Sequence, residues 1–494
     1  MDTSKLTVLE IRDMLAKGSV TSEQLVASYK DAFEKKNADI NAYLEFFNDA
    51  LDEAKKADQK RAELIAAGKN ADQINADFPL LGVPLAMKDN VVIKDKVASA
   101  ASKILEKYAS PYDSTVTAKL KAAGAVFLGR VNMDEFAMGG STENSAYGVT
   151  KNPHDTSRVS GGSSGGSAAV LAMGGAPASL GSDTGGSIRQ PAAYNGVVGL
   201  KPTYGTVSRH GLMAMGSSLD VIGPLAHTVA DIELLFEIIK NTDGDRYDST
   251  SLTKKDIEKV AAEHSSDPAK LRVGIVPELM NVGGLDASVV EAMNKTVEAL
   301  KAAGCEVKEV SLPHMKYSLA VYYILMPAEV SSNMARFDGV KYGSKVEGAD
   351  LLGDYLNTRG ELLGKEVRRR IMLGTYVLSS GYHDAYYNKA NIVKDLIAGD
   401  FKKAFESVDV ILTPTTPTPA FKIGSHTDDP VQMYLEDIFT VTANLVGSPA
   451  LSVPAGFADI EGKKLPVGVQ FTAPHCREDI LFAVGKKVEQ GRGF

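Results

Sequence analysis

Two clusters of glycine and serine hold the residue types of this chain that are best suited to covalent catalysis. The first cluster is Gly161–Ser167 (GGSSGGS) and the second is Gly185–Ser187 (GGS). An apolar run separates them, which a flexible Gly/Ser linker would lack. Glycines allow backbone N–H groups to approach a ligand, and serines among them can be nucleophiles or proton carriers. The pattern favours two tight loops joined by buried structure; two glycine turns that only pack together are the alternative.

A lysine in an apolar segment is the candidate base. Lys88 lies in PLLGVPLAMKDNVVI, residues 79–93, which contains short strand-like apolar pieces. Burying a cation there is costly. Lys88 therefore lies either on a solvent-exposed strand edge or in a desolvated position where it is neutral and can act as a base. Because the reference pKa of lysine is about 10.4, the second alternative requires burial to lower it by about 3 units.

Other familiar motifs explain the two clusters less well. Neither cluster is followed by Gly-Lys-Ser/Thr, which excludes a phosphate-binding P-loop. The pattern G-x-S-x-G is centred on Ser163 and again on Ser164, but the polar KNPHDTSRVS before it is not the buried strand that a nucleophile elbow requires. An S-x-x-K at Ser251–Lys254 lies in a charged segment. A Ser-His-Asp triad stays open, because the chain has eight histidines, although none lies in a motif.

The elements that must position these residues alternate between helix and strand. Residues 5–76 have helical periodicity, with an N-cap at Thr21 or Ser22. Strands separated by helices predict an α/β fold with a mixed sheet covered by helices, and we expect residues 1–76 to be a helical segment packed on one catalytic domain, 77–494. We expect a helix and then a strand within 113–129, strands at 197–200, 272–276, 306–310 and 408–413, helices at 229–239 and 287–303, and a surface excursion over 240–271.

Composition and charge restrict the class of protein. The 494 residues carry a net charge of −8, from 54 basic and 62 acidic residues that are interspersed, so no basic field favours direct nucleic-acid binding. The two cysteines, Cys305 and Cys476, have neither metal-ligand spacing nor a disulfide pattern. A basic-then-apolar leader and a run of about 18 apolar residues are both missing from the sequence. We expect a cytoplasmic globular protein without a membrane span.

Taken together, the motifs around Lys88 and in the two clusters resemble the amidase signature family. The resemblance covers nearly the whole chain. It rests on MKDN (87–90), GGSSGGSAA (161–169), SDTGGSIRQPA (182–192) and GVVGLKPTYG (196–205), in that order. Ser160, where proline is usual, and VASAA (97–101), which lacks a threonine-rich start, depart from the family pattern without touching these motifs. The resemblance implies the amidase-signature fold, with a large mixed sheet covered by helices on both faces.

The resemblance also implies a Ser-Ser-Lys catalytic triad. Matched motif by motif, Ser187 is the nucleophile, Ser163 is the bridging serine that follows a cis peptide bond in the family, and Lys88 is the base. Lys88 precedes Ser163 by 75 residues (163 − 88), and Ser163 precedes Ser187 by 24 (187 − 163). Amide hydrolysis also needs donors for the oxyanion. We expect these to be backbone N–H groups of the DTGG run, from Thr184, Gly185 and Gly186.

Further segments resemble one subgroup of that family, the A subunits of the aspartyl/glutamyl-tRNA amidotransferases. In that subgroup the enzyme hydrolyses glutamine and passes ammonia to a partner protein. By this resemblance Arg369, with Arg370 beside it, would bind the α-carboxylate of glutamine, and Asp437 would bind its α-ammonium; a surface charge is the alternative for each. Tyr322 or Tyr323 would line the pocket. The segments are NMDEFAMGGSTENSAYG (132–148), YYILMPAEVSSNMARFDGVKYG (322–343), RRRIMLGTYVLSSGYHDAYY (368–387) and MYLEDIFT (433–440).

The subgroup resemblance implies partners but no cofactor or metal in this chain. It implies a heterotrimer with B and C subunits, in which the B subunit handles ATP, Mg²⁺ and the mischarged Glu-tRNA(Gln) or Asp-tRNA(Asn). The acidic balance of this chain agrees with an indirect role toward tRNA. A free-standing amidase that acts on other amides and a non-catalytic scaffold are the alternatives. The presence of Lys88, Ser163 and Ser187 argues against the scaffold.

Overall fold

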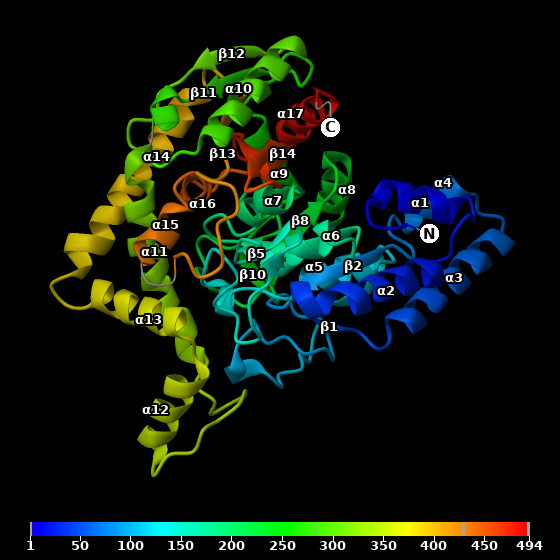
Figure 1. The fold of residues 1–494 in the computed structure, drawn as a ribbon, viewed down its shortest axis with the longest axis horizontal. Coiled ribbons are helices and arrows are strands. Elements are labelled where there is room, and N and C mark those ends of the chain that lie inside the picture. Colours follow the sequence, from blue (N-terminus) through cyan, green and yellow to red (C-terminus); the bar gives the residue numbers. More distant parts are fainter. Residues whose placement is uncertain (1, 282, 427–429, 492–494) are drawn as a thin grey trace.

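The computed structural model describes residues 2–281, 283–426 and 430–491 and shows one large mixed sheet of 11 strands (Figure 1). The strand order is β1-β3-β2-β6-β8-β7-β14-β15-β13-β11-β12. Parallel pairs, such as β2 with β3 and with β6, lie beside antiparallel pairs, such as β14 with β15. The predicted α/β architecture with a mixed sheet is therefore confirmed.

The strands of the sheet are mostly short and buried. Two additional two-stranded ladders, β4–β5 and β9–β10, lie outside it. The strand bounds are β1 Tyr43–Phe46, β2 Pro84–Lys88, β3 Val126–Val131, β4 Lys151–Asn152, β5 Asp155–Val159, β6 Ala178–Asp183, β7 Val198–Lys201, β8 Val221–Ala226, β9 Asp243–Asp245, β10 Asp248–Thr253, β11 Arg272–Ile275, β12 Glu306–Glu309, β13 Val410–Pro414, β14 Ala450–Ile460 and β15 Lys463–Thr472.

Helices surround the sheet, and the expected helices at 229–239 and 287–303 match α8 and α10 to within one residue. The helix bounds are α1 Val8–Ala16, α2 Ser22–Ile40, α3 Ala50–Ala66, α4 Ala71–Asp77, α5 Thr115–Ala122, α6 Gly165–Ala172, α7 Arg189–Asn195, α8 Val229–Ile239, α9 Lys254–Ala261, α10 Ala287–Ala302, α11 Ser318–Asn333, α12 Leu351–Leu362, α13 Lys365–Leu378, α14 Lys389–Ala404, α15 Pro430–Leu435, α16 Val441–Leu445 and α17 Glu478–Gly491.

Helices cover both faces of the sheet at β14. A β-carbon on Gly468 would contact Ala193 of α7 and the Ser452 side chain, whereas one on Gly485 of α17 would contact Leu451. Leu451 and Ser452 are consecutive residues of β14, so their side chains point to opposite faces. α7 and α17 therefore pack against opposite sides of the same strand.

The N-terminal segment differs from its prediction in one place. Residues 5–76 form α1 to α4 as expected, but β1 lies between α2 and α3 and pairs with β3 at the edge of the large sheet. Asn41 ends α2 in a left-handed conformation (φ 57°), which turns the chain into this strand. Four residues are too few for a strand periodicity to stand out between two long helices. The division at residue 77 stays a prediction.

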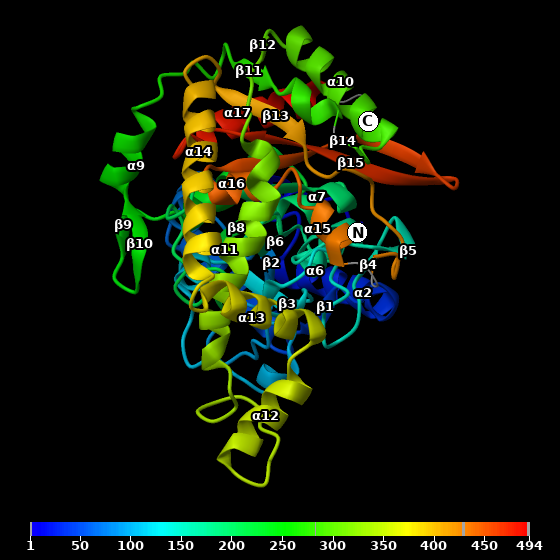
Figure 2. The same cartoon turned by 90° about the vertical axis from the view of Figure 1, so that its left-hand side faces the viewer.

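The surface excursion expected over 240–271 is confirmed. It consists of the β9–β10 ladder and α9, a helix with no buried residue, which project from one edge of the molecule (Figure 2). α11, α13 and α14 form a separate layer along one side of the sheet, with α11 packed closely on α13, whereas α12 projects away from the sheet (Figure 2). Both cysteines are buried and free. No helix within the described residues is long and apolar enough to cross a bilayer.

The topology brings the chemistry-bearing segments to the carboxyl ends of two neighbouring strands. β2 and β6 are parallel, with Met87 opposite Leu180. Lys88 is the last residue of β2, and Asp183 is the last residue of β6. Since the carboxyl ends of adjacent parallel strands meet at one edge of an α/β sheet, the chain after β6 passes close to Lys88.

Candidate active site

Lys88 is fully buried at the end of β2, where its amine meets three hydroxyl groups. Nζ lies 2.9 Å from Ser163 Oγ, 2.7 Å from Ser164 Oγ and 2.9 Å from Ser182 Oγ. A fourth contact, of 3.3 Å, joins Nζ to the Ser182 carbonyl oxygen. Of the two positions that the sequence allowed for this lysine, the structure confirms the desolvated one.

Burial sets the protonation of Lys88. Removal from water penalises the ammonium form and lowers the pKa of Lys88 to about 7, although the carboxylates of Asp134, Asp183 and Asp220 act in the opposite direction. A lysine with such a pKa is substantially neutral at physiological pH. Its lone pair can then accept a proton, which an ordinary surface lysine cannot do at that pH.

The first glycine-serine cluster is buried, begins as a loop and continues into the first turn of α6, and packs against another part of the chain. The peptide bond between Gly162 and Ser163 is cis. A β-carbon on Gly162 would lie 2.1 Å from Asp134 Oδ2, and one on Gly165 would lie 2.2 Å from Thr142 Oγ1. The glycines are therefore required by close packing, and the loop holds Ser163 rigidly beside Lys88.

Ser187 lies in the turn between β6 and α7. Its carbonyl oxygen accepts a hydrogen bond of 3.1 Å from the Ser164 amide. Its side chain is nearly buried, with 8% of the residue exposed, and within the described residues its hydroxyl has no hydrogen-bond partner. We refer to Lys88, Ser163, Ser164, Ser182 and Ser187 as the inner cluster.

A buried ion pair holds the Ser187 turn in shape. Asp183 accepts hydrogen bonds from the amides of Gly186 (2.8 Å) and Ile188 (3.1 Å). Arg189, which is fully buried, donates to both oxygens of the same carboxylate, at 3.0 and 3.1 Å. Although burial alone would raise it, the Arg189 guanidinium lowers the pKa of Asp183 to about 2, so the pair stays charged.

The predicted oxyanion donors differ in their availability. The Gly186 amide is already bonded to Asp183, whereas no group in the described chain accepts from the amides of Gly185 and Ser187. Gly186 has a φ of +133°, and a β-carbon there would lie 2.3 Å from Thr440 Oγ1. Both the backbone conformation and the space at this turn therefore exclude a larger residue.

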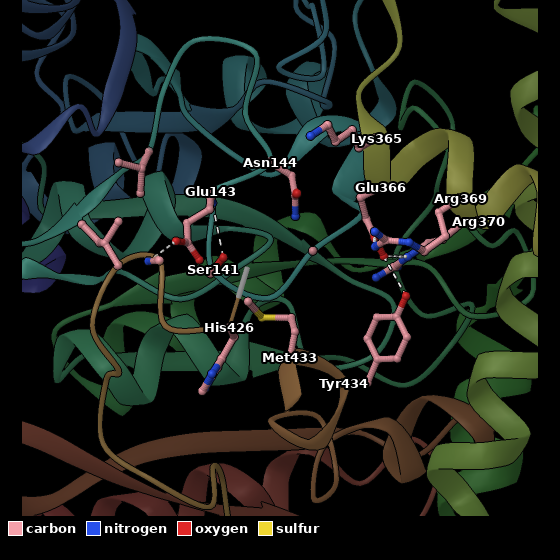
Figure 3. A pocket seen from close by; sticks show the side chains of 14 residues that line it. Ser141, Glu143, Asn144, Lys365, Glu366, Arg369, Arg370, His426, Met433 and Tyr434 are labelled. Carbon is pink, nitrogen blue, oxygen red and sulfur yellow. Dashed lines mark hydrogen bonds and ion pairs between the residues drawn. The ribbon is translucent and has the colours of Figure 1, made fainter. Parts of the chain in front are cut away.

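A second group of polar side chains lies beside a cavity of about 480 Å³ (Figure 3). Glu366, Arg369, Arg370 and Tyr434 gather on one side of this cavity and point toward one another. Arg370 Nε donates to Glu366 at 2.8 Å, and the Tyr434 hydroxyl donates to the same carboxylate at 3.0 Å. The lining residues are Gly139, Ser141, Glu143, Asn144, Val149, Lys365, Glu366, Arg369, Arg370, Ile423, Gly424, His426, Met433 and Tyr434.

Tyrosines connect this group to Asp437. The Tyr323 hydroxyl donates to Asp437 Oδ2 at 2.7 Å, and its ring stacks on that of Tyr434 with centroids 3.9 Å apart. The Arg370 guanidinium lies 5.7 Å and 5.8 Å from the two ring centroids. Burial raises the pKa of Asp437 to about 7, although the Tyr323 hydroxyl opposes the shift. We refer to Tyr323, Glu366, Arg369, Arg370, Tyr434 and Asp437 as the outer cluster.

Arg369 and Arg370, which the sequence did not separate as candidates for carboxylate binding, have different environments in the structure. The Arg370 side chain is 5% exposed and lies against the tyrosine pair, whereas that of Arg369 is 42% exposed and pairs only with Glu366. Tyr322 lies between the Ser187 turn and the outer cluster: a β-carbon on Gly185 would lie 2.5 Å from its ring and hydroxyl, and its ring packs against that of Tyr323 with centroids 5.1 Å apart. The outer cluster therefore lies next to the Ser187 turn.

Sequence analysis missed several residues of both clusters. Ser182 and Asn90 lie inside the quoted motifs, but their spacing gives no separate signal. A charged residue in an apolar stretch is a signal, and Arg189 in GGSIRQP carries it. Glu366 and Tyr434 have no comparable signal, because both lie in charged or mixed segments.

Histidine and metal chemistry find no support in this geometry. All eight histidines lie in the described residues, and none forms a hydrogen bond with Ser163, Ser164 or Ser187. Within the described part of the chain, no three His, Cys, Asp or Glu side chains come together as metal ligands. Lys88 is thus the basic side chain that contacts Ser163 and Ser164 within the described residues.

Comparison with known proteins places the chain among enzymes that act on amides. The family model described as Amidase matches residues 24–482. The chain is 49% identical over 492 residues to the glutamyl-tRNA(Gln) amidotransferase A subunit of Desulfosudis oleivorans, covering 99% of this chain and 98% of that protein. A second protein of that name, from Desulfatibacillum aliphaticivorans, is 47% identical over 494 residues, covering 100% and 99%. The crystal structure of the glutamyl-tRNA(Gln) amidotransferase A subunit from Thermotoga maritima matches this structure with a TM-score of 0.78 and 38% identity, covering 100% of this chain and 96% of that one.

Proposed function

From the premise that the chain belongs to the amidase family, we propose that it is the glutamine-hydrolysing component of a tRNA-dependent amidotransferase. Relatives aligned over nearly their whole length carry the name of the A subunit of such an enzyme. The observation that carries the proposal is the contact between the buried Lys88 amine and Ser163, beside the Ser187 turn. This is the arrangement that a Ser-Ser-Lys hydrolase needs.

The first chemical step forms an ester on Ser187. Neutral Lys88 accepts the Ser163 proton while Ser163 accepts the Ser187 proton, and Ser187 Oγ attacks the side-chain amide carbon of glutamine. The tetrahedral intermediate collapses as the C–N bond breaks, and the relay runs backwards to protonate the departing nitrogen as ammonia. The Ser163 and Ser187 hydroxyls are not hydrogen-bonded to each other in this structure. The relay requires this contact to form in the enzyme–substrate complex, where catalytic hydrogen bonds commonly tighten.

The second step returns the enzyme to its starting state. Water, deprotonated through the same relay, attacks the γ-glutamyl ester and releases glutamate and free Ser187. In both steps, negative charge develops on the former amide oxygen. We assign its stabilisation to the unpaired amides of Gly185 and Ser187, with Thr184 as a further donor and Gly186 as a turn-forming residue. Such donors are typically worth about 3–4 kcal/mol each in the transition state.

The outer cluster supplies the charges that distinguish glutamine from a simple amide. Asp437 would bind the α-ammonium, and an arginine would bind the α-carboxylate through a planar fork. Arg370 suits this role better than Arg369, because it is desolvated and tied through Tyr323 to Asp437. Glutamine would thereby enter with its two α-substituents fixed and its side-chain amide directed toward Ser187.

The proposed function requires partners. We infer that B and C subunits complete a heterotrimer, that ATP and Mg²⁺ act at the B subunit, and that the ammonia is used there on Glu-tRNA(Gln) or Asp-tRNA(Asn). No cofactor is required by the chemistry assigned to this chain. Because aminoacyl-tRNA is used in the cytoplasm, we infer that the complex acts there.

A glutaminase assay of the chain, alone and co-purified with its partners, tests this function. We expect glutamate and ammonia in equal amounts, at a rate that rises on assembly and disappears in Ser187→Ala. Rapid hydrolysis of aliphatic amides by the isolated chain, without preference for glutamine, would identify a free-standing amidase instead. A complex that transfers ammonia equally well with Ser187→Ala would identify a scaffold.

A further inference from the structure

We propose that Ser182 and Asn90 are positioning residues that hold the Lys88 amine toward Ser163, an inference that rests on the proposed function of the inner cluster. Ser182 Oγ lies 2.9 Å from Lys88 Nζ, and Asn90 Nδ2 donates to the same oxygen at 3.0 Å. Both residues are buried, with 2% and 1% exposed. The three groups therefore form a chain, Asn90–Ser182–Lys88, that no solvent interrupts.

The contacts of the amine account for every hydrogen it can donate. As an ammonium group, Lys88 has three N–H donors and meets three hydroxyl oxygens, those of Ser163, Ser164 and Ser182. After losing one proton it keeps two N–H donors and one lone pair. With Ser164 accepting one N–H group and Ser182 accepting the other, through its hydroxyl or its carbonyl oxygen, the lone pair is left for the third hydroxyl, that of Ser163.

The surroundings of Ser164 and Ser182 favour this distribution. The Ser164 hydroxyl donates to the Ser182 carbonyl at 3.0 Å, so its own hydrogen is engaged away from Lys88. Ser182 Oγ also receives a hydrogen bond from Asn90 Nδ2, which holds this oxygen within hydrogen-bond distance of the lysine amine. A four-carbon lysine side chain has many rotamers, and these contacts limit the direction of its terminal amine.

Asn90 is held in place by a backbone contact with the connection between β7 and β8. It follows Lys88 by two residues, and its carbonyl oxygen accepts from the Met213 amide at 2.9 Å. Its Oδ1 is buried and has no hydrogen-bond partner within the described residues. An unpaired buried amide oxygen is unfavourable. A side chain that accepts this cost while donating to Ser182, the direct neighbour of the Lys88 amine, is better explained by a role in positioning than by stabilisation of the fold.

Alanine variants assayed across pH test the inference. In Ser182→Ala, we expect kcat to fall about tenfold with little change in KM. The ammonium form also loses an acceptor, so the acid limb of the pH profile should move about one unit toward lower pH. Ser182→Thr, which keeps a hydroxyl, should restore both values toward wild type. Asn90→Ala, which leaves β6 intact, should lower kcat about threefold at unchanged KM.

Ser179→Ala provides the matched control. Ser179 is a fully buried serine of the same strand, but its hydroxyl donates to the Ser167 carbonyl and does not contact Lys88. The Ser179→Ala variant should leave the acid limb of the pH profile at its wild-type position. A loss of folded protein would lower kcat without moving that limb.

An unchanged acid limb and kcat in Ser182→Ala, or an equal change in Ser179→Ala, would overturn the inference. The proposed function would survive that result if Ser187→Ala is still inactive. If the enzyme instead hydrolyses an amide other than glutamine, the same variants are tested on that amide. The positioning of Lys88 is then judged independently of the substrate.

Discussion

The inner and outer clusters handle buried charge in opposite ways. In the inner cluster, burial works against a cation, and Lys88 is left with a pKa of about 7 and only hydroxyl and carbonyl partners. In the outer cluster, Arg370 is as deeply buried but pairs with Glu366, which together with nearby tyrosines raises its pKa above the ordinary value despite burial. The difference teaches that burial lowers the pKa of a cationic side chain only where no paired carboxylate offsets the loss of water.

This difference matches the two tasks of an enzyme that hydrolyses the side-chain amide of an amino acid, which are proton transfer and recognition of the charged substrate. A proton relay needs a group that can exist in both protonation states near neutral pH. A recognition site needs a cation that never loses its charge. Changes in the inner cluster should therefore act on kcat for every amide, and changes in the outer cluster should act on KM for glutamine.

The largest effect is expected for Lys88→Met. Removing the base should lower kcat by about 10³-fold or more on glutamine and on a small aliphatic amide alike, because both use the same relay. Steady-state kinetics on the two substrates measure this.

Lys201 is the matched control, since it is also fully buried with a pKa lowered by desolvation to about 7. Among the residues that the structure describes, its amine donates only to the Pro202 carbonyl, at 2.9 Å, and hydrogen-bonds to no serine. Lys201→Met should keep kcat within about threefold of wild type. Equal losses in the two variants would show that a buried lysine matters here for packing rather than for proton transfer.

The next largest effect separates the adjacent arginines of the outer cluster. Arg370→Lys keeps the charge but loses the planar fork, so KM for glutamine should rise about 30-fold. Arg369→Lys should raise it about threefold, because that side chain is partly exposed. Kinetics with glutamine measure both variants. A larger rise in KM for Arg369→Lys than for Arg370→Lys would instead assign binding of the α-carboxylate to Arg369, the arginine that the family resemblance indicated.

Asp437→Asn should have a smaller and more selective effect. Without its negative charge the site loses attraction for the α-ammonium, and KM for glutamine should rise about tenfold. An amide of similar size without an α-amine should keep its KM. Competition between the two amides in one assay would reveal the change directly, and equal losses on both would contradict the ammonium assignment.

The smallest effect is a difference in pH dependence between the two substrates. Lys88 must lose a proton to act and Asp437 must be ionised to bind an ammonium, and both conditions fail as the pH falls through about 7. On the acid side of the pH profile, hydrolysis of glutamine should therefore be inhibited by two protonations, of Lys88 and Asp437. Hydrolysis of the small amide should be inhibited by the protonation of Lys88 alone. At pH 6.5 the additional loss of kcat/KM for glutamine is about fourfold. Parallel acid limbs for the two substrates would remove Asp437 from this role.

The resemblance of short motifs to the amidase signature family brought Lys88, Ser163 and Ser187 into one hypothesis. Each lies in a short segment whose composition dictates a local backbone: an apolar strand ending at Lys88, and glycine-rich turns around the serines. The alternation of helix and strand likewise predicted the mixed sheet. The desolvation of Lys88 was one of two alternatives, because an apolar neighbourhood in sequence does not say whether the strand is central or at an edge.

Only the tertiary structure determined the side-chain contacts between segments that are far apart in the chain. The contacts of Arg370 with Tyr323 and Tyr434 join α11, α13 and α15, and no local pattern specifies how these helices pack. The engagement of the Gly186 amide by Asp183, and the contact of Ser182 with Lys88, depend on side-chain directions within about 3 Å. The reason is physical: periodicity and glycine content determine backbone conformation residue by residue, whereas charge recognition depends on distances that only the packed layers determine.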